Sequence, residues 1–184
     1  MEANLRDHRS NAYTHTFVSP VGELYGAVDK IGRVLYLGFY EPAHLTAGYD
    51  LVENKYACGE LEFQVDQYFC GQRELFSIDL KLEGTSFQKS VWSRLSKIPF
   101  GQTLSYGEIA QKIGRQDAAR AVGNAVAANP IVIIIPCHRV LPVSGRLGNY
   151  AMRSLDAERG REIKRYLLGL ERREELFTSS KASA

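Results

Sequence analysis

"SYGEIAQKIGRQDAARAVGNAVAA", residues 105 to 128, has the pattern of two short helices joined by a turn that contains a glycine. Ser105 and Glu108 form a capping-box pattern, which opens a helix, and Gly114 is placed to end that helix. The second helix follows after only a few residues, as in a helix-turn-helix motif. An ordinary helical hairpin in a core has the same pattern, so the outer face of the second helix must distinguish the two.

The second helix has one apolar face and one face of mostly small residues. At 100° per residue, the positions expected to be buried are Ala118, Val122, Ala125 and Val126. The opposite face carries Arg120, Gly123, Asn124 and Ala127. Small residues allow a partner to approach the backbone closely, and DNA probed by a single arginine fits such a face. The alternative is another protein element packed on the glycine and alanines.

The rest of the chain divides near residues 82–86 into two parts. We expect an N-terminal α/β domain over 1–84, a C-terminal domain over 85–176 and a disordered tail over 177–184. Segments rich in β-branched and aromatic residues predict strands at 13–19, 23–28, 33–39 and 75–82. Helical spacing predicts helices at 61–69, from the Thr85 and Gln88 capping box to Pro99, and around 163–170. The N-terminal part contains no recognisable catalytic motif.

Composition limits the possible classes of protein. The chain has 184 residues, is 45% hydrophobic and carries a formal net charge of +2, so it can bury a substantial core and has no bulk charge that demands a polyanion. No apolar run reaches the ~20 residues of a membrane-spanning helix, and the first residues lack the apolar middle of a signal peptide. Three cysteines without framework spacing indicate reduced thiols. We therefore expect a cytoplasmic protein, nuclear if eukaryotic, with no membrane partner.

"NPIVIIIPCHRV", residues 129 to 140, places a cysteine and a histidine after five β-branched residues. We expect 131–135 to be a buried strand, with Cys137 at its end and Asn129 folded back toward the turn. A cysteine nucleophile must lose its proton, and His138 can accept it directly across a turn or through a water. Glu171, on the inner edge of the last helix, can orient His138 as in a triad. A structural cysteine beside a histidine is the alternative.

These motifs resemble a known family. "IPCHRV" with Asn129 eight positions before Cys137, "SYGEIA" at 105–110 and "AARAVGNA" at 118–125 are closely similar to the O6-alkylguanine-DNA alkyltransferases, also called methylated-DNA-protein-cysteine methyltransferases. The resemblance is dense over residues 85 to 150, continues at "YLLGLE", and extends loosely through "SPVGEL" in the N-terminal part.

The resemblance implies an α+β protein of two domains, a ribonuclease-H-like N-terminal α/β domain and a C-terminal winged helix-turn-helix. It implies DNA repair by stoichiometric, single-turnover transfer of an alkyl group from O6-alkylguanine to the protein, and it leaves O4-alkylthymine open as a further substrate. The partner would be double-stranded DNA, bound in the minor groove with the damaged nucleotide flipped out. The family chemistry needs no cofactor and no obligate protein partner.

The resemblance also assigns roles. Cys137 would accept the alkyl group, His138 would activate it through a water, Glu171 would orient His138, and Asn129 would brace the turn. Arg120 would replace the extruded nucleotide, and Tyr106 would press on the target phosphate and donate to the base. The remaining assigned positions are Gly123, Asn124 and Ala127 in the DNA-binding face, and Val140, Tyr150 and Ala151, with Tyr106, in the alkyl pocket.

Some relatives carry a structural zinc in the N-terminal domain, but a metal is not expected here. Cys58 and Cys70 lack the spacing of paired ligands, and the histidines of the N-terminal part, His8, His15 and His44, are far from them in sequence.

One departure from the family lies between Tyr150 and the last helix, where residues 151–162 form a longer connection. With Arg153, Arg159 and Arg161 it is predicted to be a movable lid on the alkyl pocket that also holds DNA phosphates. The alternative is an extra first turn of the last helix. Two other functions remain as alternatives: a lesion sensor, which in this family lacks the acceptor cysteine, and a cysteine hydrolase, which has no use for a helix-turn-helix.

Overall fold

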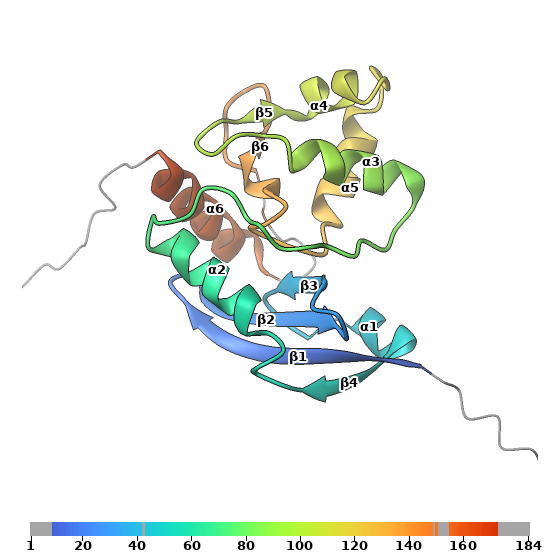
Figure 1. Ribbon diagram of the computed structural model, residues 1–184. Helices are drawn as coiled ribbons and strands as arrows, with labels where there is room; N and C mark the ends of the chain where they lie inside the picture. Colours follow the sequence, from blue (N-terminus) through green and yellow to red (C-terminus); the bar gives the residue numbers. More distant parts are fainter. Residues whose placement is uncertain (1–8, 42, 149, 151–154, 173–184) are drawn as a thin grey trace, which may run out of the picture.

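The computed structural model describes residues 9–41, 43–148, 150 and 155–172 (Figure 1). Its fold is mixed α and β. Within these residues, no helix is both long and apolar enough to cross a membrane.

The N-terminal half is a twisted sheet covered on one face by a helix (Figure 1). Its elements are β1 (Ser10–Ser19), β2 (Gly22–Asp29), β3 (Val34–Gly38), α1 (Ala43–Gly48), β4 (Tyr49–Glu53) and α2 (Gly59–Phe69). The strand order is β3-β2-β1-β4, with β4 parallel to β1 and the other pairs antiparallel. The three predicted strands within residues 13–39 and the helix at 61–69 are confirmed, whereas α1 and β4 were not predicted.

Residues 75–82 do not form the predicted strand. Only Leu80 pairs with β3, through a single bridge to Val34, in which the Val34 N–H donates to the Asp79 carbonyl and the Lys81 N–H to the Val34 carbonyl. The alternating apolar side chains instead lie half-buried against the core from an extended segment. Alternation reports which side chains face the core, and a segment can satisfy it without a continuous ladder of hydrogen bonds.

The C-terminal half holds a cluster of three helices in mutual contact beside a short two-stranded ribbon (Figure 1). Its elements are α3 (Ser86–Leu95), β5 (Leu104–Ser105), α4 (Tyr106–Lys112), α5 (Ala119–Ala127), the 3-10 turn η1 (Cys137–Arg139), β6 (Val140–Leu141) and α6 (Ala157–Glu171). Both predicted capping boxes are present, at Thr85 with Gln88 and at Ser105 with Glu108. The parallel pairing of β5 with β6 brings the start of α4 beside the chain that follows Cys137.

The helix pair α4 and α5 is oriented as the pattern predicts. Val122, Ala125 and Val126 are buried, while Ala118 is the half-buried residue before the first turn. The indole N–H of Trp92, on α3, donates to the Ala125 carbonyl at 2.8 Å, which fixes α5 against α3. The opposite face of α5 is therefore directed away from the core.

Residues 131–135 are buried except for the half-buried Ile134, but they form a turn rather than the predicted strand. The segment touches the N-terminal sheet through one bridge between Ile131 and Leu37, and then reverses, with the Ile135 N–H donating to the Ile131 carbonyl at 3.0 Å. Ile133, at the reversal, has a left-handed backbone with φ of 72°, which is strained for a β-branched residue. An apolar run reports burial, and burial does not distinguish a strand from a turn.

The lid prediction is wrong for the described part of residues 151–162. Asp156 caps α6 by accepting hydrogen bonds from the N–H groups of Glu158 and Arg159, so 157–162 are the first turns of the last helix. Arg159 reaches the Val21 carbonyl at 3.0 Å in the N-terminal half. Gly160 is buried, and a Cβ there would clash with the Tyr150 carbonyl oxygen, so these turns are packed against the rest of the protein. Residues 151–154, including Arg153, lie outside the described residues.

One apolar core runs through both halves. Its members include Leu61 and Tyr68 of α2, Trp92 of α3, Ile131 of the reversed segment and Ile163 of α6. The two halves are thus packed together around a shared interior, and Cys137 is itself one of the buried residues of that core.

Candidate active site

Cys137 is the first residue of η1 and is only 4% exposed. The Asn129 side-chain amide donates to Cys137 Sγ at 3.0 Å and to the Ile135 carbonyl at 2.8 Å, while its oxygen accepts from the Ile131 N–H at 3.1 Å. Asn129 therefore fastens both ends of the reversed segment and touches the sulfur itself. The predicted fold-back of Asn129 toward the turn is confirmed.

His138 is fully buried, and its Nε2 lies 2.6 Å from Glu171 Oε1. Because an ionised carboxylate only accepts hydrogen bonds, Nε2 carries the proton and Nδ1 has the free lone pair. Within the described residues, Nδ1 is buried and has no hydrogen-bond partner. The predicted pairing of His138 with Glu171 is present, and it leaves the other ring nitrogen available to accept a proton.

Glu171 has three further donors that the sequence did not reveal. The Arg139 guanidinium binds both of its oxygens at 2.8 Å, the Gly101 N–H donates to Oε2 at 3.1 Å, and the Tyr68 hydroxyl donates to Oε1 at 2.8 Å. Burial alone would raise the pKa of Glu171, but hydrogen bonds from His138 and Arg139 outweigh it and lower the pKa to about 2. The carboxylate is therefore ionised throughout the physiological range.

Burial governs the protonation of the thiol and of the imidazole. It raises the pKa of Cys137, although the Asn129 hydrogen bond and the charge of Lys164 act in the opposite direction. Burial also lowers the pKa of His138, against the opposing effect of Glu171. The resting site thus holds a neutral thiol and a neutral imidazole, which is the combination that a proton transfer from sulfur to histidine requires.

Lys164 is a buried cation that sequence reasoning missed. It is 1% exposed, its Nζ donates to the Val140 carbonyl at 2.7 Å, and burial lowers its pKa to about 8 while Cys137 acts to raise it. The helical spacing of the sequence indicates this position, because Lys164 lies three residues before Leu167 and seven before Glu171, on the packed face of α6. A positive charge near the sulfur favours the thiolate.

Two tyrosines flank the thiol. Burial raises the pKa of Tyr106, and the proximity of Cys137 adds to this effect. Tyr150 is 3% exposed, its ring lies edge-on to His138 with centroids 6.3 Å apart, and its pKa is raised well above the ordinary value by burial and then by Cys137. The predicted pocket residues Tyr106 and Tyr150 therefore lie near Cys137. Val140 follows η1, and its backbone N–H donates to the Cys137 carbonyl, whereas Ala151 lies outside the described residues.

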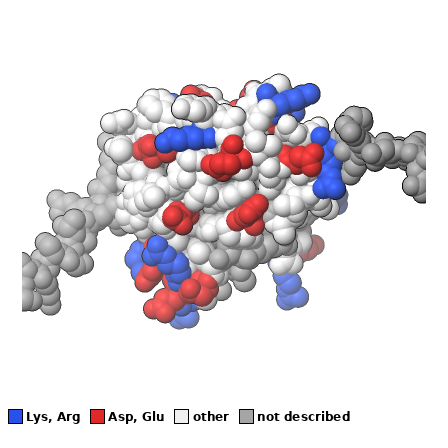
Figure 2. Space-filling view, turned by 90° about the horizontal axis from the view of Figure 1, so that it is seen from below, with Lys and Arg blue, Asp and Glu red and all other residues white. Residues whose placement is uncertain are grey.

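The outer face of α5 adjoins this pocket. Arg120 and Asn124 are exposed, and Gly123 and Ala127 are half-buried. A Cβ on Gly123 would lie 3.9 Å from the Tyr106 ring, an ordinary van der Waals distance, so α5 packs beside the pocket wall at this position. By contrast, the face of the molecule seen from below, on the side of the N-terminal sheet, mixes acidic and basic side chains, with acidic ones across its middle (Figure 2).

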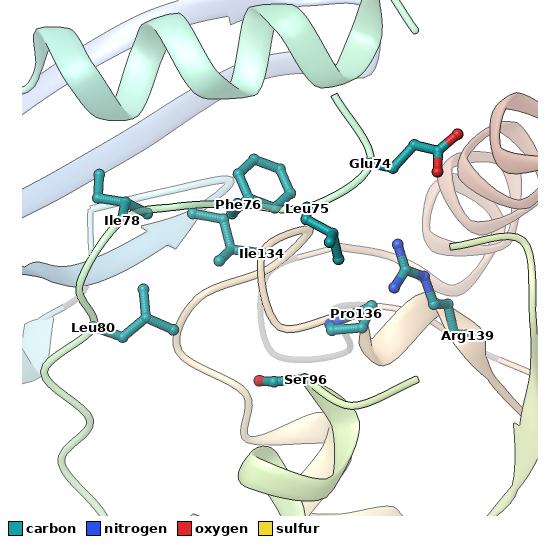
Figure 3. Close-up of a pocket in the computed structure, with 9 residues that line it drawn as sticks. All are labelled: Glu74, Leu75, Phe76, Ile78, Leu80, Ser96, Ile134, Pro136 and Arg139. Carbon is teal, nitrogen blue, oxygen red and sulfur yellow. The ribbon is translucent and has the colours of Figure 1, made fainter. Parts of the chain in front are cut away.

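A separate cavity of about 130 Å³ lies beside residues 134–139, the chain around Cys137 (Figure 3). Its lining residues come from the extended segment near 74–80, the end of α3 and the chain around Cys137: Glu74, Leu75, Phe76, Ile78, Leu80, Ser96, Ile134, Pro136 and Arg139. Cys137, Tyr106 and Tyr150 are not among them, so this cavity is distinct from the candidate alkyl pocket.

The other two cysteines lie apart from this site. Cys58 is buried and its thiol donates to the Tyr13 carbonyl at 3.5 Å, while Cys70 is exposed at the end of α2. Among the described residues, no group of three His, Cys, Asp or Glu side chains could hold a metal ion. His8 lies outside the described residues, and the absence of a structural metal stays a prediction.

Comparison with known proteins agrees with this geometry. Residues 86–173 match the family model described as 6-O-methylguanine DNA methyltransferase, DNA binding domain. The methylated-DNA-protein-cysteine methyltransferase of Methanosarcina acetivorans is 42% identical over 160 residues, which cover 86% of this chain and 97% of that protein. The crystal structure of Mycobacterium tuberculosis OGT in complex with DNA superposes with a TM-score of 0.78 at 39% identity, over 88% of this chain and 93% of that one. This chain therefore belongs to the methylated-DNA-protein-cysteine methyltransferase family.

Proposed function

We propose that this protein repairs DNA by transferring an alkyl group from O6 of an alkylated guanine to Sγ of Cys137. The observation that carries the proposal is the buried arrangement in which Asn129 donates to the sulfur and Glu171 holds the His138 ring with its other nitrogen free. O4-alkylthymine remains a candidate second substrate, and the site proposed here requires no cofactor.

The proposed chemistry is a displacement at the alkyl carbon. The Cys137 proton passes to His138 Nδ1 through a bridging water, and Glu171 stabilises the imidazolium that results. The thiolate then forms a bond to the alkyl carbon while the carbon–O6 bond breaks, and the guanine anion takes a proton from the Tyr106 hydroxyl. The positive charge of Lys164 supports the thiolate. A thioether is not reversed by ordinary thiol exchange, so each molecule reacts once.

The proposed DNA complex uses α5 in the minor groove. Arg120 enters the duplex in place of the extruded nucleotide, and Gly123, Asn124 and Ala127 allow the helix to approach the backbone. Tyr106, at the start of α4, presses on the target phosphate and lies between the groove and Cys137. Flipping costs a few kcal/mol and least for a poorly paired base, so an O6-alkylguanine is the easiest to extrude.

The same proposal assigns domains and compartment. Residues 1–84 form a ribonuclease-H-like domain, supported by the order of its four strands, and 85–176 form a winged helix-turn-helix, supported by the α4–α5 pair and the β5–β6 ribbon. The proposed tail, 177–184, lies outside the described residues. A cytoplasmic location, or a nuclear one in a eukaryote, suits a protein that acts on DNA.

The function is tested by incubating the wild-type protein with an excess of duplex DNA containing O6-methylguanine and analysing its peptides by mass spectrometry. We expect one methyl group per protein, on the peptide that contains Cys137, and none on the peptides of Cys58 or Cys70. Methylation that continues through many equivalents of DNA, or a methyl group on another residue, contradicts the proposal.

Arg120→Ala is expected to slow repair of duplex DNA much more than reaction with free O6-benzylguanine, by roughly tenfold or more in the ratio of the two rates. The reason is that a free base needs no extrusion. Arg115→Ala, which removes another exposed arginine between α4 and α5, is the matched control and should not change the ratio. Equal losses on both substrates for Arg120→Ala would place its role in the thiol chemistry instead.

A further inference from the structure

Tyr68 is the one residue of α2 whose side chain makes a hydrogen bond to the candidate active site among the described residues. It is completely buried, it lies 103 positions before Glu171 in the chain, and its hydroxyl donates to Glu171 Oε1 at 2.8 Å. The same oxygen binds His138 Nε2 at 2.6 Å. The N-terminal half therefore touches the carboxylate at the atom that orients the proposed base.

The Tyr68 ring is held by a cluster of aromatic side chains. Its centroid lies 5.4 Å from that of Phe69, 5.6 Å from Phe76 and 6.2 Å from Phe100. The guanidinium of Arg139 lies over the same Phe100 ring, 5.7 Å from its centroid. One cluster thus fixes the direction of two of the donors that converge on Glu171.

The hydroxyl cannot act as an acid in this place. Burial raises the pKa of Tyr68 far above the ordinary value, and the charge of Glu171 raises it further, so the group stays protonated and donates its hydrogen bond permanently. A permanent donor on Oε1 withdraws part of the negative charge that would otherwise stabilise a protonated His138. It therefore keeps the imidazole neutral while holding the carboxylate in position.

We propose that Tyr68 is a positioning residue for alkyl transfer, supplied by the N-terminal half, which sets the basicity of His138 through its hydrogen bond to Glu171. This inference rests on the proposed role of His138 as the base for Cys137. Its consequence is that the two halves form one catalytic unit, since the N-terminal half supplies Tyr68 as a donor to Oε1 beside the Arg139 guanidinium of the C-terminal half.

The test is the pH dependence of the single-turnover rate with free O6-benzylguanine, for the wild-type full-length chain and for Tyr68→Phe. The variant keeps the ring and loses only the hydroxyl, so Oε1 gains charge, His138 binds its proton more tightly, and the acid limb of the profile moves to higher pH by roughly half a unit or more. Tyr166→Phe is the matched control, because Tyr166 contacts the same cluster through Phe69. Among the described residues, Glu171 accepts hydrogen bonds from His138, Arg139, Gly101 and Tyr68, and Tyr166 is not one of these donors. The acid limb of Tyr166→Phe should coincide with that of the wild type.

A second substitution is expected to shift the acid limb of the pH profile in the opposite direction. Tyr68→3-fluorotyrosine retains the ring and makes the hydroxyl a stronger donor, so the acid limb should move to lower pH. An acid limb that stays at its wild-type position in both variants, whatever happens to their melting temperatures, overturns the inference and leaves Tyr68 with a packing role alone.

The proposed function can fail separately. If the wild-type protein does not alkylate Cys137, the pKa of His138 is measured directly by NMR titration of its ring in the unreacted wild type and in Tyr68→Phe. A higher His138 pKa in the variant supports the influence of Tyr68 even then, and an unchanged pKa overturns it.

Discussion

Replacing Cys137 by serine is expected to abolish alkyl transfer while leaving the affinity for duplex DNA close to that of the wild type. A serine hydroxyl has nearly the same shape but is far less acidic, and only the deprotonated group is an effective nucleophile. The site makes this requirement severe, because burial already raises the pKa of the thiol, and in the proposed mechanism its deprotonation depends on transfer to His138. The Asn129 amide can donate to an oxygen as it does to the sulfur, so the reversed segment should keep its conformation.

Two measurements check this expectation: methyl transfer from an O6-methylguanine duplex, followed by mass spectrometry, and duplex affinity, followed by fluorescence anisotropy. Cys70→Ser is the matched control, since Cys70 is exposed at the end of α2 and should be dispensable for both. Transfer by Cys137→Ser at a rate within tenfold of the wild type would show that another residue accepts the alkyl group.

The parts of the molecule that sequence reasoning predicted correctly are those with local signals. Both capping boxes depend on residues three positions apart, so the starts of α3 and α4 can be predicted from the sequence alone. The buried face of α5 follows from helical periodicity alone. The position of Glu171 was found in the same way, from its spacing relative to Leu167 on the packed face of α6.

The parts that were missed depend on contacts without a local signal. The turn at 131–135 needs a left-handed Ile133, a conformation that the residue type itself disfavours and that the surrounding hydrogen bonds impose. α1 and β4 are only six and five residues long, too short to establish a period. The donation from Tyr68 to Glu171 spans 103 positions, and nothing near either residue indicates it.

Glu171→Gln is expected to slow alkyl transfer by roughly 100-fold or more. A glutamine at this position offers an amide in place of one carboxylate oxygen, so it can hold the His138 ring in the wrong tautomer and gives no charge to stabilise an imidazolium. The single-turnover rate with free O6-benzylguanine isolates this effect from DNA binding. Glu162→Gln on the same helix, where Glu162 is exposed and pairs with Arg159 at 3.3 Å, is the matched control and should react like the wild type.

The same substitution should also destabilise the fold, because it leaves the buried Arg139 guanidinium without a counter-ion. Removing one partner of a buried ion pair costs about 3–5 kcal/mol of the free energy of unfolding. Urea denaturation followed by the fluorescence of Trp92, the single tryptophan of the chain, measures this cost. An unfolding free energy equal to that of the wild type at neutral pH would mean that Arg139 finds another partner.

The pH dependence of that difference provides the sharpest check on the site. Glu171 has a folded-state pKa of about 2, lowered from 4.5, so its contribution to stability is complete above pH 4.5 and is lost as the pH falls toward 2. Glutamine does not titrate. The gap in unfolding free energy between wild type and Glu171→Gln should therefore be widest near neutral pH and narrow steadily between pH 4.5 and 2, whereas the gap between wild type and Glu162→Gln should show no comparable narrowing. A difference in unfolding free energy for Glu171→Gln that is the same at pH 7 and pH 3 would mean that the carboxylate is not held ionised by His138 and Arg139. The proposed role of Glu171 in stabilising a protonated His138 would then lose its basis.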